Sequence, residues 1–569
     1  MAERFDPVSL EILWSRLINI TEECWVTIWR TAFSMIIGEA QDFGCELLDA
    51  NGESLAHSPR SMPVFNLTLP RAVRALLERF PPATLQEGDL LATNDPWICA
   101  GHLFDLALVS PVFRRGRLVG LVGSIAHCSD VGGTLDSLSV REIYEEGLQI
   151  PPMKLFRRGE PNEEVLDLIR QNVRKGDMVV GDLQAQLSAN RVGAERLLRF
   201  MEEYGLDDLA ELAEVIQGRA ERAMREAIRA VPDGEYSHEV EFEAVDRRLT
   251  LPVRVEVRGD ELLVDWAGAP PQVDRGAINC TYSYTAAHTV YALKCMLTPE
   301  IPSNAGCFRP IHVTAPEGSI LNCSYPAGVN LRTMTGWYCA PALFGALASA
   351  MPDRVQGFTG MPMGAGTYGL ERDGSTFNDH LFQGGGQGAS AHSDGKSALL
   401  FPTSAANTPV EMFENRTPLL VERKELIPDS GGPGRSRGGL GQRVQVRKLY
   451  EDGQQALVSL HPQGIEVETG GHFGGRAGRR AAISVADVDS VRDHAALGGL
   501  AELRSPRQLL TIELAGGSGY GDPGERPIAE VQRDLDEGLV TEEGLRPYDC
   551  RLLPNGQVAR YGTGPAGED

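Results

Sequence analysis

TNDPWICAGHLFDLALVSPVFRRGRLVGLVGSIAHCSDVGG, residues 93–133, is the stretch around which the rest of the chain is organised. It holds two apolar runs, LALVSPVF and LVGLVGSIA, which are separated by the polar segment RRGR. Two apolar runs joined by a short polar turn predict a hairpin or a pair of neighbouring strands. The end of the second run is then expected to lie beside the start of the first.

The same stretch carries metal-ligating residue types at both expected strand ends. His102 and Asp105 come just before the first apolar run, and His127 ends the second. The hairpin therefore places these three residues within reach of one ion. Nitrogen and oxygen ligands suit Zn, Mn or Fe(II), and the lack of paired thiolates argues against a structural zinc site. Spacing alone leaves a second interpretation open, in which these residues are hydrogen-bonded packing residues.

Length and charge narrow the class of protein. A chain of 569 residues is expected to form several domains. Asp plus Glu number 78 against 54 Lys plus Arg, and a net charge of -24 opposes a nucleic acid or an anionic membrane as a partner. The ten cysteines include no CxxC pair, so we expect reduced thiols and a cytoplasmic protein. We expect neither a signal peptide nor a membrane span.

The order of patterns along the chain predicts an α+β, multidomain protein. Asp6 and Pro7 start a long amphipathic helix within the first forty residues, with Trp25 and Trp29 expected in the core. Helical patterns dominate again from residue 163 to 230. This first region, residues 1–234, is a mixed helical part with the metal-bearing strands.

The pattern of polar and apolar residues changes after residue 234. Segments that alternate with period two, separated by Gly and Pro turns, predict antiparallel strands. We expect a β-rich, glycine-rich middle region over residues 235–442 and a C-terminal α+β region over residues 443–569. Residues 519–524 (GYGDPG) fit a dinucleotide-loop pattern, but an Asp and a Pro stand where a pyrophosphate needs backbone donors. Residues 395–397 (GKS) resemble the end of a phosphate-binding loop, but Ser390 stands where that loop needs a glycine, so no ATP site is expected on this chain.

Several motifs together resemble the hydantoinase B/oxoprolinase family, which supplies the B-type subunits of ATP-dependent hydantoinases, oxoprolinases and lactamases and of acetone and acetophenone carboxylases. The resemblance covers most of the chain. The segments that carry it are DPVSLEILWSRL, DFGCELLD, GDLLATNDPW, GHLFD, AHCSDVGG, EIYEEGLQIPPMKL, NTPVEMFE, PDSGGPGRSRGGLG and GGSGYGDP.

The resemblance implies a metal site and a reaction. It adds Asp42 to the set above, so the implied ligands of a divalent ion (Zn, Mn or Fe) are Asp42, His102, Asp105 and His127. It implies a hetero-oligomer in which ATP and Mg bind to an A-type ATPase subunit, which activates a small cyclic amide or ketone. The expected reaction is hydrolysis of a hydantoin, 5-oxoproline or another lactam. A ketone carboxylase subunit and a non-catalytic scaffold for the ATPase are the alternatives.

Four further acidic residues are candidates for proton transfer or for supporting an imidazole N–H, namely Asp130, Glu142, Glu145 and Glu146. The pattern also allows the three glutamates to be a solvated acidic turn. Departures from the family lie nearby: this chain has CAGHLFD for GGTHLPD, Cys128 for a second His, and TLDSL for PGSMP. Because of these departures, the identity of the substrate is less well predicted than the metal site.

Overall fold

The computed structural model describes residues 5–468, 470–487, 490–493 and 499–561. Their contacts form two compact units, each built from separate segments of the chain. The first unit comprises residues 1–236, 254–339 and 403–406, and the second comprises 237–253, 340–402 and 407–569. Helices and sheets are mixed in an α+β fold. The division into regions 1–234, 235–442 and 443–569 stays a prediction.

An antiparallel sheet is the centre of the first unit. Among the described residues it has seven strands in the order β2-β1-β5-β4-β3-β6-β7. The strands are β1 (Phe43–Asp49), β2 (Ser54–His57), β3 (Leu90–Thr93), β4 (Asp105–Arg114), β5 (Arg117–His127), β6 (Met153–Arg157) and β7 (Glu160–Pro161).

The hairpin predicted from residues 93–133 is confirmed. Strands β4 and β5 pair antiparallel across the turn, and Asp105 lies directly opposite His127. Strand β1 pairs with the other edge of β5, where Phe43 lies opposite Ala126. The start of β1, the end of β5 and the start of β4 therefore meet at one margin of the sheet.

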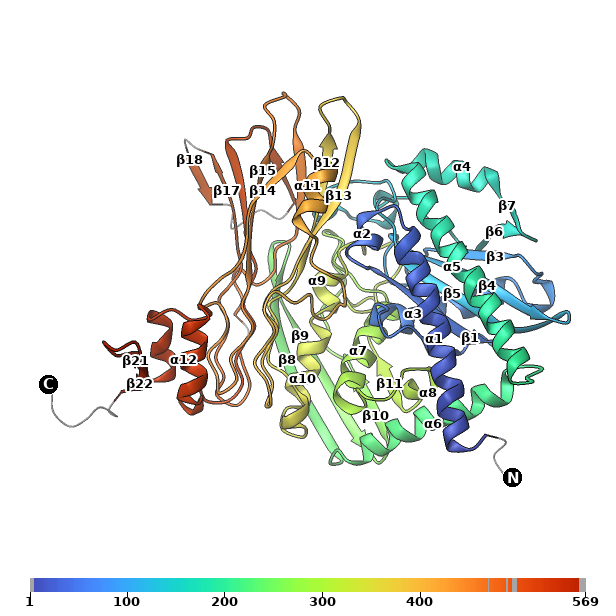
Figure 1. Ribbon diagram of the computed structural model, residues 1–569, viewed down its shortest axis with the longest axis horizontal. Coiled ribbons are helices and arrows are strands. Elements are labelled where there is room, and N and C mark those ends of the chain that lie inside the picture. The colour runs from blue at the N-terminus through green and yellow to red at the C-terminus, as the bar shows by residue number, and fades with distance from the viewer. Residues whose placement is uncertain (1–4, 469, 488–489, 494–498, 562–569) are drawn as a thin grey trace. The chain divides into compact units, whose positions relative to one another are not determined.

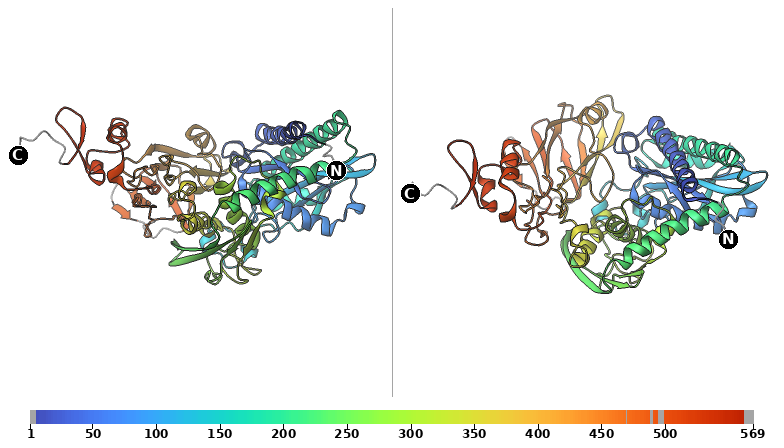
Figure 2. Two further views of the ribbon diagram at one scale, coloured as in Figure 1. Left: turned by 90° about the horizontal axis from the view of Figure 1, so that it is seen from below. Right: turned by 60° about the horizontal axis from the view of Figure 1, so that its bottom comes forward.

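Helices cover both faces of this sheet. Alternate residues of β5 face opposite sides, and a Cβ added at Gly123 would meet Leu69 of α3 (Pro63–Arg79). Val122, the preceding residue, lies against Gly193 of α5 (Gly176–Glu203). Helix α1 (Pro7–Thr31) packs beside α5 (Figure 1, Figure 2). The other helices of this unit are α2 (Met35–Gly38), α4 (Glu163–Asn172), α6 (Ala210–Arg229), α7 (Tyr282–Leu297), α8 (Ala305–Phe308) and α9 (Thr333–Gly336).

Helix α1 agrees with the sequence except at one tryptophan. Asp6 accepts hydrogen bonds from the main-chain N–H groups of Val8 and Ser9, and Pro7 occupies the first turn. Trp25 is buried, as predicted, but Trp29 is 39% exposed, so its assignment to the core was wrong. None of the described helices combines the length and the apolar composition needed to cross a lipid bilayer.

The strands predicted after residue 234 are present, but the region is not uniformly β. A four-stranded sheet has the order β11-β10-β9-β8. Its strands are β8 (Gly234–Ala244), β9 (Arg247–Arg258), β10 (Glu261–Asp265) and β11 (Ile311–Thr314). Helix α7 interrupts this region and corrects the expectation. Nearly all its residues are buried, so the polar and apolar alternation that marks a surface helix is missing.

The second unit contains two larger sheets, in the orders β13-β12-β16-β19 and β14-β15-β20-β17-β18, and the hairpin β21-β22. Its strands are β12 (Met363–Leu370), β13 (Thr376–Gln383), β14 (Leu419–Leu426), β15 (Gln442–Lys448), β16 (Ala456–Leu460), β17 (Ala482–Asp487), β18 (Ser490–Asp493), β19 (Gly499–Leu503), β20 (Gln508–Glu513), β21 (Cys550–Leu552) and β22 (Val558–Arg560). Helices α10 (Cys339–Leu347), α11 (Val410–Arg416) and α12 (Ile528–Asp536) complete the described α-helices.

Candidate metal centre

The sheet margin described above brings together the four residues that were predicted as metal ligands. One ligand atom each of His102, Asp105 and His127 lies within 4.8 Å of the others. His127 Nδ1 lies 3.1 Å from Asp105 Oδ1 and 3.8 Å from Asp42 Oδ2. Antiparallel pairing explains this convergence, because β1, β4 and β5 begin or end at the same margin.

Main-chain geometry fixes the imidazole of His102. Its Nδ1 lies 3.2 Å from the carbonyl oxygen of Asn330, and a carbonyl can only accept, so Nδ1 carries the proton. The preceding Gly101 has φ = +88°, and a Cβ there would come within 2.8 Å of both Arg332 and Tyr284. Burial, and next the charge of Arg332, lower the pKa of His102 to about 4. The side chain is therefore a neutral imidazole with its lone pair on Nε2.

Within the part of the chain that the structure describes, that lone pair has no hydrogen-bond partner. His102 Nε2 is buried and lies 3.0 Å from Asp105 Oδ2, in a geometry that gives it no hydrogen-bond partner. With Nδ1 protonated, the two atoms that face each other both carry lone pairs. The two lone pairs repel each other unless a cation lies between them.

Arg332 is the residue of this site that the sequence did not predict. Its Nη2 donates to Asp105 Oδ2 at 2.6 Å, and its Nε donates to the carbonyl of Ala100 at 2.7 Å. The guanidinium also lies 4.4 Å from the ring centre of Tyr284. Burial opposes ionisation of Asp105, but the charge of Arg332 and the contact with His127 hold its pKa well below the usual range. No local pattern marks Arg332, which stands 227 residues from Asp105.

Asp42 is a buried carboxyl group whose ionisation is less favoured than that of Asp105. Burial raises its pKa to about 6, against the opposing charge of His127. The main-chain carbonyl of Asp42 accepts a hydrogen bond from the N–H of His127 at 3.0 Å, which joins the two residues through the backbone as well. The cluster thus contains two carboxyl groups, two imidazoles and one guanidinium.

The four further acidic candidates occupy different environments. Glu142 and Glu145 are exposed, and Glu145 Oε1 accepts the main-chain N–H of Glu142 at 3.3 Å. Asp130 is buried and pairs with Arg174 at 2.6 Å. Glu146 is also buried, so a solvated face was the wrong interpretation for this residue. The proton-transfer roles of all four stay predictions.

Glu146 contacts the segment that orients His102. Its Oε1 accepts the main-chain N–H groups of Val329 at 2.5 Å and Asn330 at 2.9 Å. Burial raises the pKa of Glu146 to about 8. The acceptor for the His102 N–H is thus the Asn330 carbonyl rather than a carboxylate. Glu146 holds the same residue in place, because it accepts the main-chain N–H of Asn330. Ser137, within the divergent TLDSL segment, contacts the Asn330 amide at 2.6 Å.

Comparisons with known proteins agree with the resemblance seen in the motifs. The sequence profile of Hydantoinase B/oxoprolinase matches residues 6–523. The B-type subunit of a putative D-/L-hydantoinase from Pseudomonas sp. (strain NS671) is 31% identical over 98% of this chain and 97% of its own. The β subunit of caprolactamase from Pseudomonas jessenii is 30% identical over 98% of each chain.

Solved structures share the fold. The ATP-dependent caprolactamase from Pseudomonas jessenii superposes with a TM-score of 0.88 at 28% identity, over 97% of this chain and 98% of that one. A nucleotide-free acetone carboxylase gives a TM-score of 0.87 over 98% of this chain and 81% of that one, but at 18% identity, so this likeness concerns the fold alone. The chain belongs to the hydantoinase B/oxoprolinase family.

Proposed function

We propose that this chain is the metal-bearing subunit of an ATP-dependent amidohydrolase that opens a hydantoin, 5-oxoproline or another lactam. Support comes from full-length similarity to proteins named as subunits of a hydantoinase and a caprolactamase. A 5-oxoprolinase from Arabidopsis thaliana is also 30% identical over 91% of this chain, which spans 42% of that protein's length. An unstrained amide is a poor electrophile, so activation by ATP fits this substrate class.

The observation that carries the metal assignment is the buried His102 Nε2, which faces Asp105 and has no hydrogen-bond partner among the described residues. Two imidazoles and two carboxyl groups are a donor set that fits Zn, Mn or Fe(II). Asp42, His102, Asp105 and His127 would hold the ion, which would supply Lewis-acid activation of a water or of the substrate oxygen.

The chain's own residues prepare this site. The Asn330 carbonyl keeps the Nε2 lone pair of His102 available, and Glu146 holds the segment that presents this carbonyl. Arg332 keeps Asp105 ionised, and its single positive charge offsets one of the two carboxylates. The remaining negative charge favours a cation at the sheet margin.

We also propose that the ATP chemistry takes place on a partner. The two relatives described above carry the names of a B-type and a β subunit, which implies at least one other kind of subunit. The sequence contains no recognisable phosphate-binding loop. An A-type ATPase subunit, loaded with ATP and Mg, would therefore activate the amide, and this chain would complete ring opening within a hetero-oligomer.

Metal analysis tests this assignment. The co-purified complex should contain about one divalent ion per copy of this chain, and replacing His102 and His127 by Ala should remove the ion and the turnover. His57→Ala is a matched control, since it removes an imidazole from β2, the edge strand of the same sheet, that is not among the four candidate ligands. Full turnover by a metal-free His102→Ala, His127→Ala variant would exclude a catalytic metal and favour a scaffold.

A ketone carboxylase is the second candidate, because acetone carboxylase shares the fold. The two reactions differ in what stimulates ATP consumption. Release of ADP and phosphate should rise with a lactam or hydantoin and stay at background with acetone plus bicarbonate. The reverse pattern would replace the hydrolase assignment by the carboxylase.

A further inference from the structure

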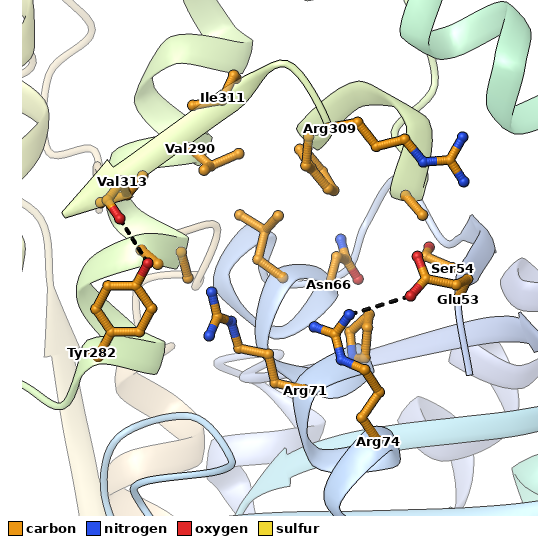
Figure 3. Close-up of a pocket in the computed structure, with 16 residues that line it drawn as sticks. Glu53, Ser54, Asn66, Arg71, Arg74, Tyr282, Val290, Arg309, Ile311 and Val313 are labelled. Atoms are coloured by element: carbon orange, nitrogen blue, oxygen red, sulfur yellow. Dashed lines mark hydrogen bonds and ion pairs between the residues drawn. The ribbon is translucent and has the colours of Figure 1, made fainter. Parts of the chain in front are cut away.

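The first unit contains a cavity of about 250 Å³ whose lining includes none of the candidate metal ligands (Figure 3). It lies between α3, α7 and the segment that runs from α8 into β11, and the turn before β2 closes one side. Ligand pockets for drug-sized molecules have roughly 300–1,000 Å³. This cavity therefore suits only a small molecule.

The polar side of the cavity has an excess of positive charge. Three arginines and one carboxylate line it. Arg74 pairs with that carboxylate, Glu53, at 3.2 Å, and Arg309 pairs with Glu221 at 3.1 Å. Arg71 differs, because within the described part of the chain it forms no ion pair with a carboxylate.

The charge of Arg71 is stabilised mainly by an aromatic ring. Its guanidinium carbon lies 5.0 Å from the ring centre of Tyr282, and Figure 3 shows it directed into the cavity from α3. Burial lowers the pKa of Arg71, against the effect of Tyr282. A half-buried guanidinium without a carboxylate is an incomplete arrangement, since buried charges in proteins are normally paired.

Asn66 provides a second, independent polar group in the lining of the cavity. Its side chain is on α3, five residues before Arg71, and the residue is only 7% exposed. Among the described residues its amide makes no hydrogen bond, and in Figure 3 it points into the space between Arg71 and Glu53. Asn66 lines the cavity, and its amide is not among the fully shielded polar groups, so it can reach a ligand bound there.

The opposite wall is apolar. Val290 of α7 and Ile311 and Val313 of β11 line it, together with Ala286 and Ala287. A guanidinium and an amide donor on one side and branched aliphatic side chains on the other match a ligand with one anionic end and one hydrocarbon end. A phosphate ion has no hydrocarbon part to use this wall.

We propose that this cavity binds a small aliphatic monocarboxylate, with its carboxylate between Arg71 and Asn66 and its hydrocarbon chain against Val290 and Ile311. Arg71 would form the charged hydrogen bonds, and Asn66 would donate its amide N–H to the second carboxylate oxygen. This inference is independent of the reaction proposed above.

Isothermal titration of the full-length protein with hexanoate tests the proposal, with hexanamide and inorganic phosphate as competing probes. We expect saturable hexanoate binding, and binding at least about tenfold weaker for hexanamide and for phosphate. Arg71→Gln should weaken hexanoate binding by about tenfold or more, and Asn66→Ala should weaken it by a smaller factor.

Arg74→Gln is the matched control, because Arg74 lines the same cavity but already pairs with Glu53. Its effect on hexanoate affinity should be less than about threefold, and thermal unfolding should confirm that each variant is folded. Equal binding of hexanoate and hexanamide by the unmodified protein would overturn the proposal without any variant. So would undiminished hexanoate binding by folded Arg71→Gln, or tighter binding of phosphate than of hexanoate.

Discussion

Arg332 and Asp105 form an ion pair that is almost completely buried, with side-chain exposures of 6% and 0%. Removing one member of such a pair leaves the other charge uncompensated in the protein interior. We expect Arg332→Gln to lower the free energy of unfolding by about 3 kcal/mol, as measured by urea denaturation at pH 7.

Arg115→Gln is the control for this experiment. Arg115 and Asp207 pair at 3.1 Å, but both side chains are 76% exposed, and exposed pairs contribute at most about 1 kcal/mol. Equal losses of unfolding free energy in the two variants would show that burial of the Arg332 pair does not increase its contribution to stability.

Glu146 should make the free energy of unfolding depend on pH. Its pKa is about 8 in the folded protein against 4.5 for an ordinary glutamate. Between these values the folded state holds a proton that the unfolded state has lost, so the contribution of Glu146 to stability falls as the pH rises from about 4.5 to about 8. Glu146→Gln should remove this dependence.

The comparison is made by measuring unfolding free energies from pH 5 to pH 8. The stability of Glu146→Gln relative to the unmodified protein should increase steadily across that range, by roughly 1 kcal/mol per pH unit or less. Glu145→Gln, at the exposed neighbouring position, should run parallel to the unmodified protein. A constant difference between Glu146→Gln and the unmodified protein would contradict a raised pKa.

At the residue scale, the spacing of residues in the sequence could predict only part of the site. His102, Asp105 and His127 flank two apolar runs, and the hairpin register places the latter two opposite each other. Asp42 was inferred only from the family motif, because pairing of β1 with β5 is a long-range contact with no local signal. Arg332 and Asn330 lie in the segment after α7, and their contacts with Asp105 and His102 are also long-range contacts without a local signal.

At the scale of elements, the glycine-rich segment around residues 430–442 is held by close backbone contacts. Gly432 donates its N–H to Gly517 at 2.7 Å, and Gly438 donates to Gly432 at 2.9 Å. A Cβ added at Gly438 would lie 1.9 Å from the carbonyl oxygen of Gly517. Because backbone cannot move aside as a flexible side chain can, these segments depend on the missing side chain.

Gly438→Ala should therefore destabilise the second unit by roughly 3 kcal/mol. Differential scanning calorimetry should show a lowered unfolding temperature. Gly470→Ala is the control in the same unit, since a Cβ at Gly470 meets nothing within 4 Å. The close-contact explanation would be wrong if both substitutions changed the unfolding temperature equally.

Sequence patterns predicted elements well where each has one buried and one exposed side. The hairpin of β4 and β5, the three helices between residues 163 and 230, and the cap of α1 are confirmed. Helix α7 was missed because it is buried on nearly all sides, so its sequence carries no helical periodicity. This missed helix contributes Tyr284 to the site and Tyr282 to the cavity.

At the scale of the whole molecule, the candidate metal centre depends on chain segments far apart in sequence. Asp42, His102, Asp105 and His127 precede residue 234, where the first region was predicted to end. Their partners Asn330 and Arg332 lie in the segment 254–339, which belongs to the same compact unit. Local sequence patterns cannot predict that a later segment of the chain packs against the first region in this way.

A fragment of residues 1–234 should therefore fail to fold independently. It would lack Arg332, so Asp105 would be buried without its guanidinium, and the N–H of His102 would lose the Asn330 carbonyl. We expect this fragment to show no cooperative thermal transition by circular dichroism, whereas the full-length chain should show one. Addition of a separate 254–339 fragment, which restores both partners, should increase the cooperative signal. If residues 1–234 alone unfolded cooperatively at the temperature of the full chain, these long-range contacts would contribute little to the first unit, and the predicted boundary would mark an independent domain.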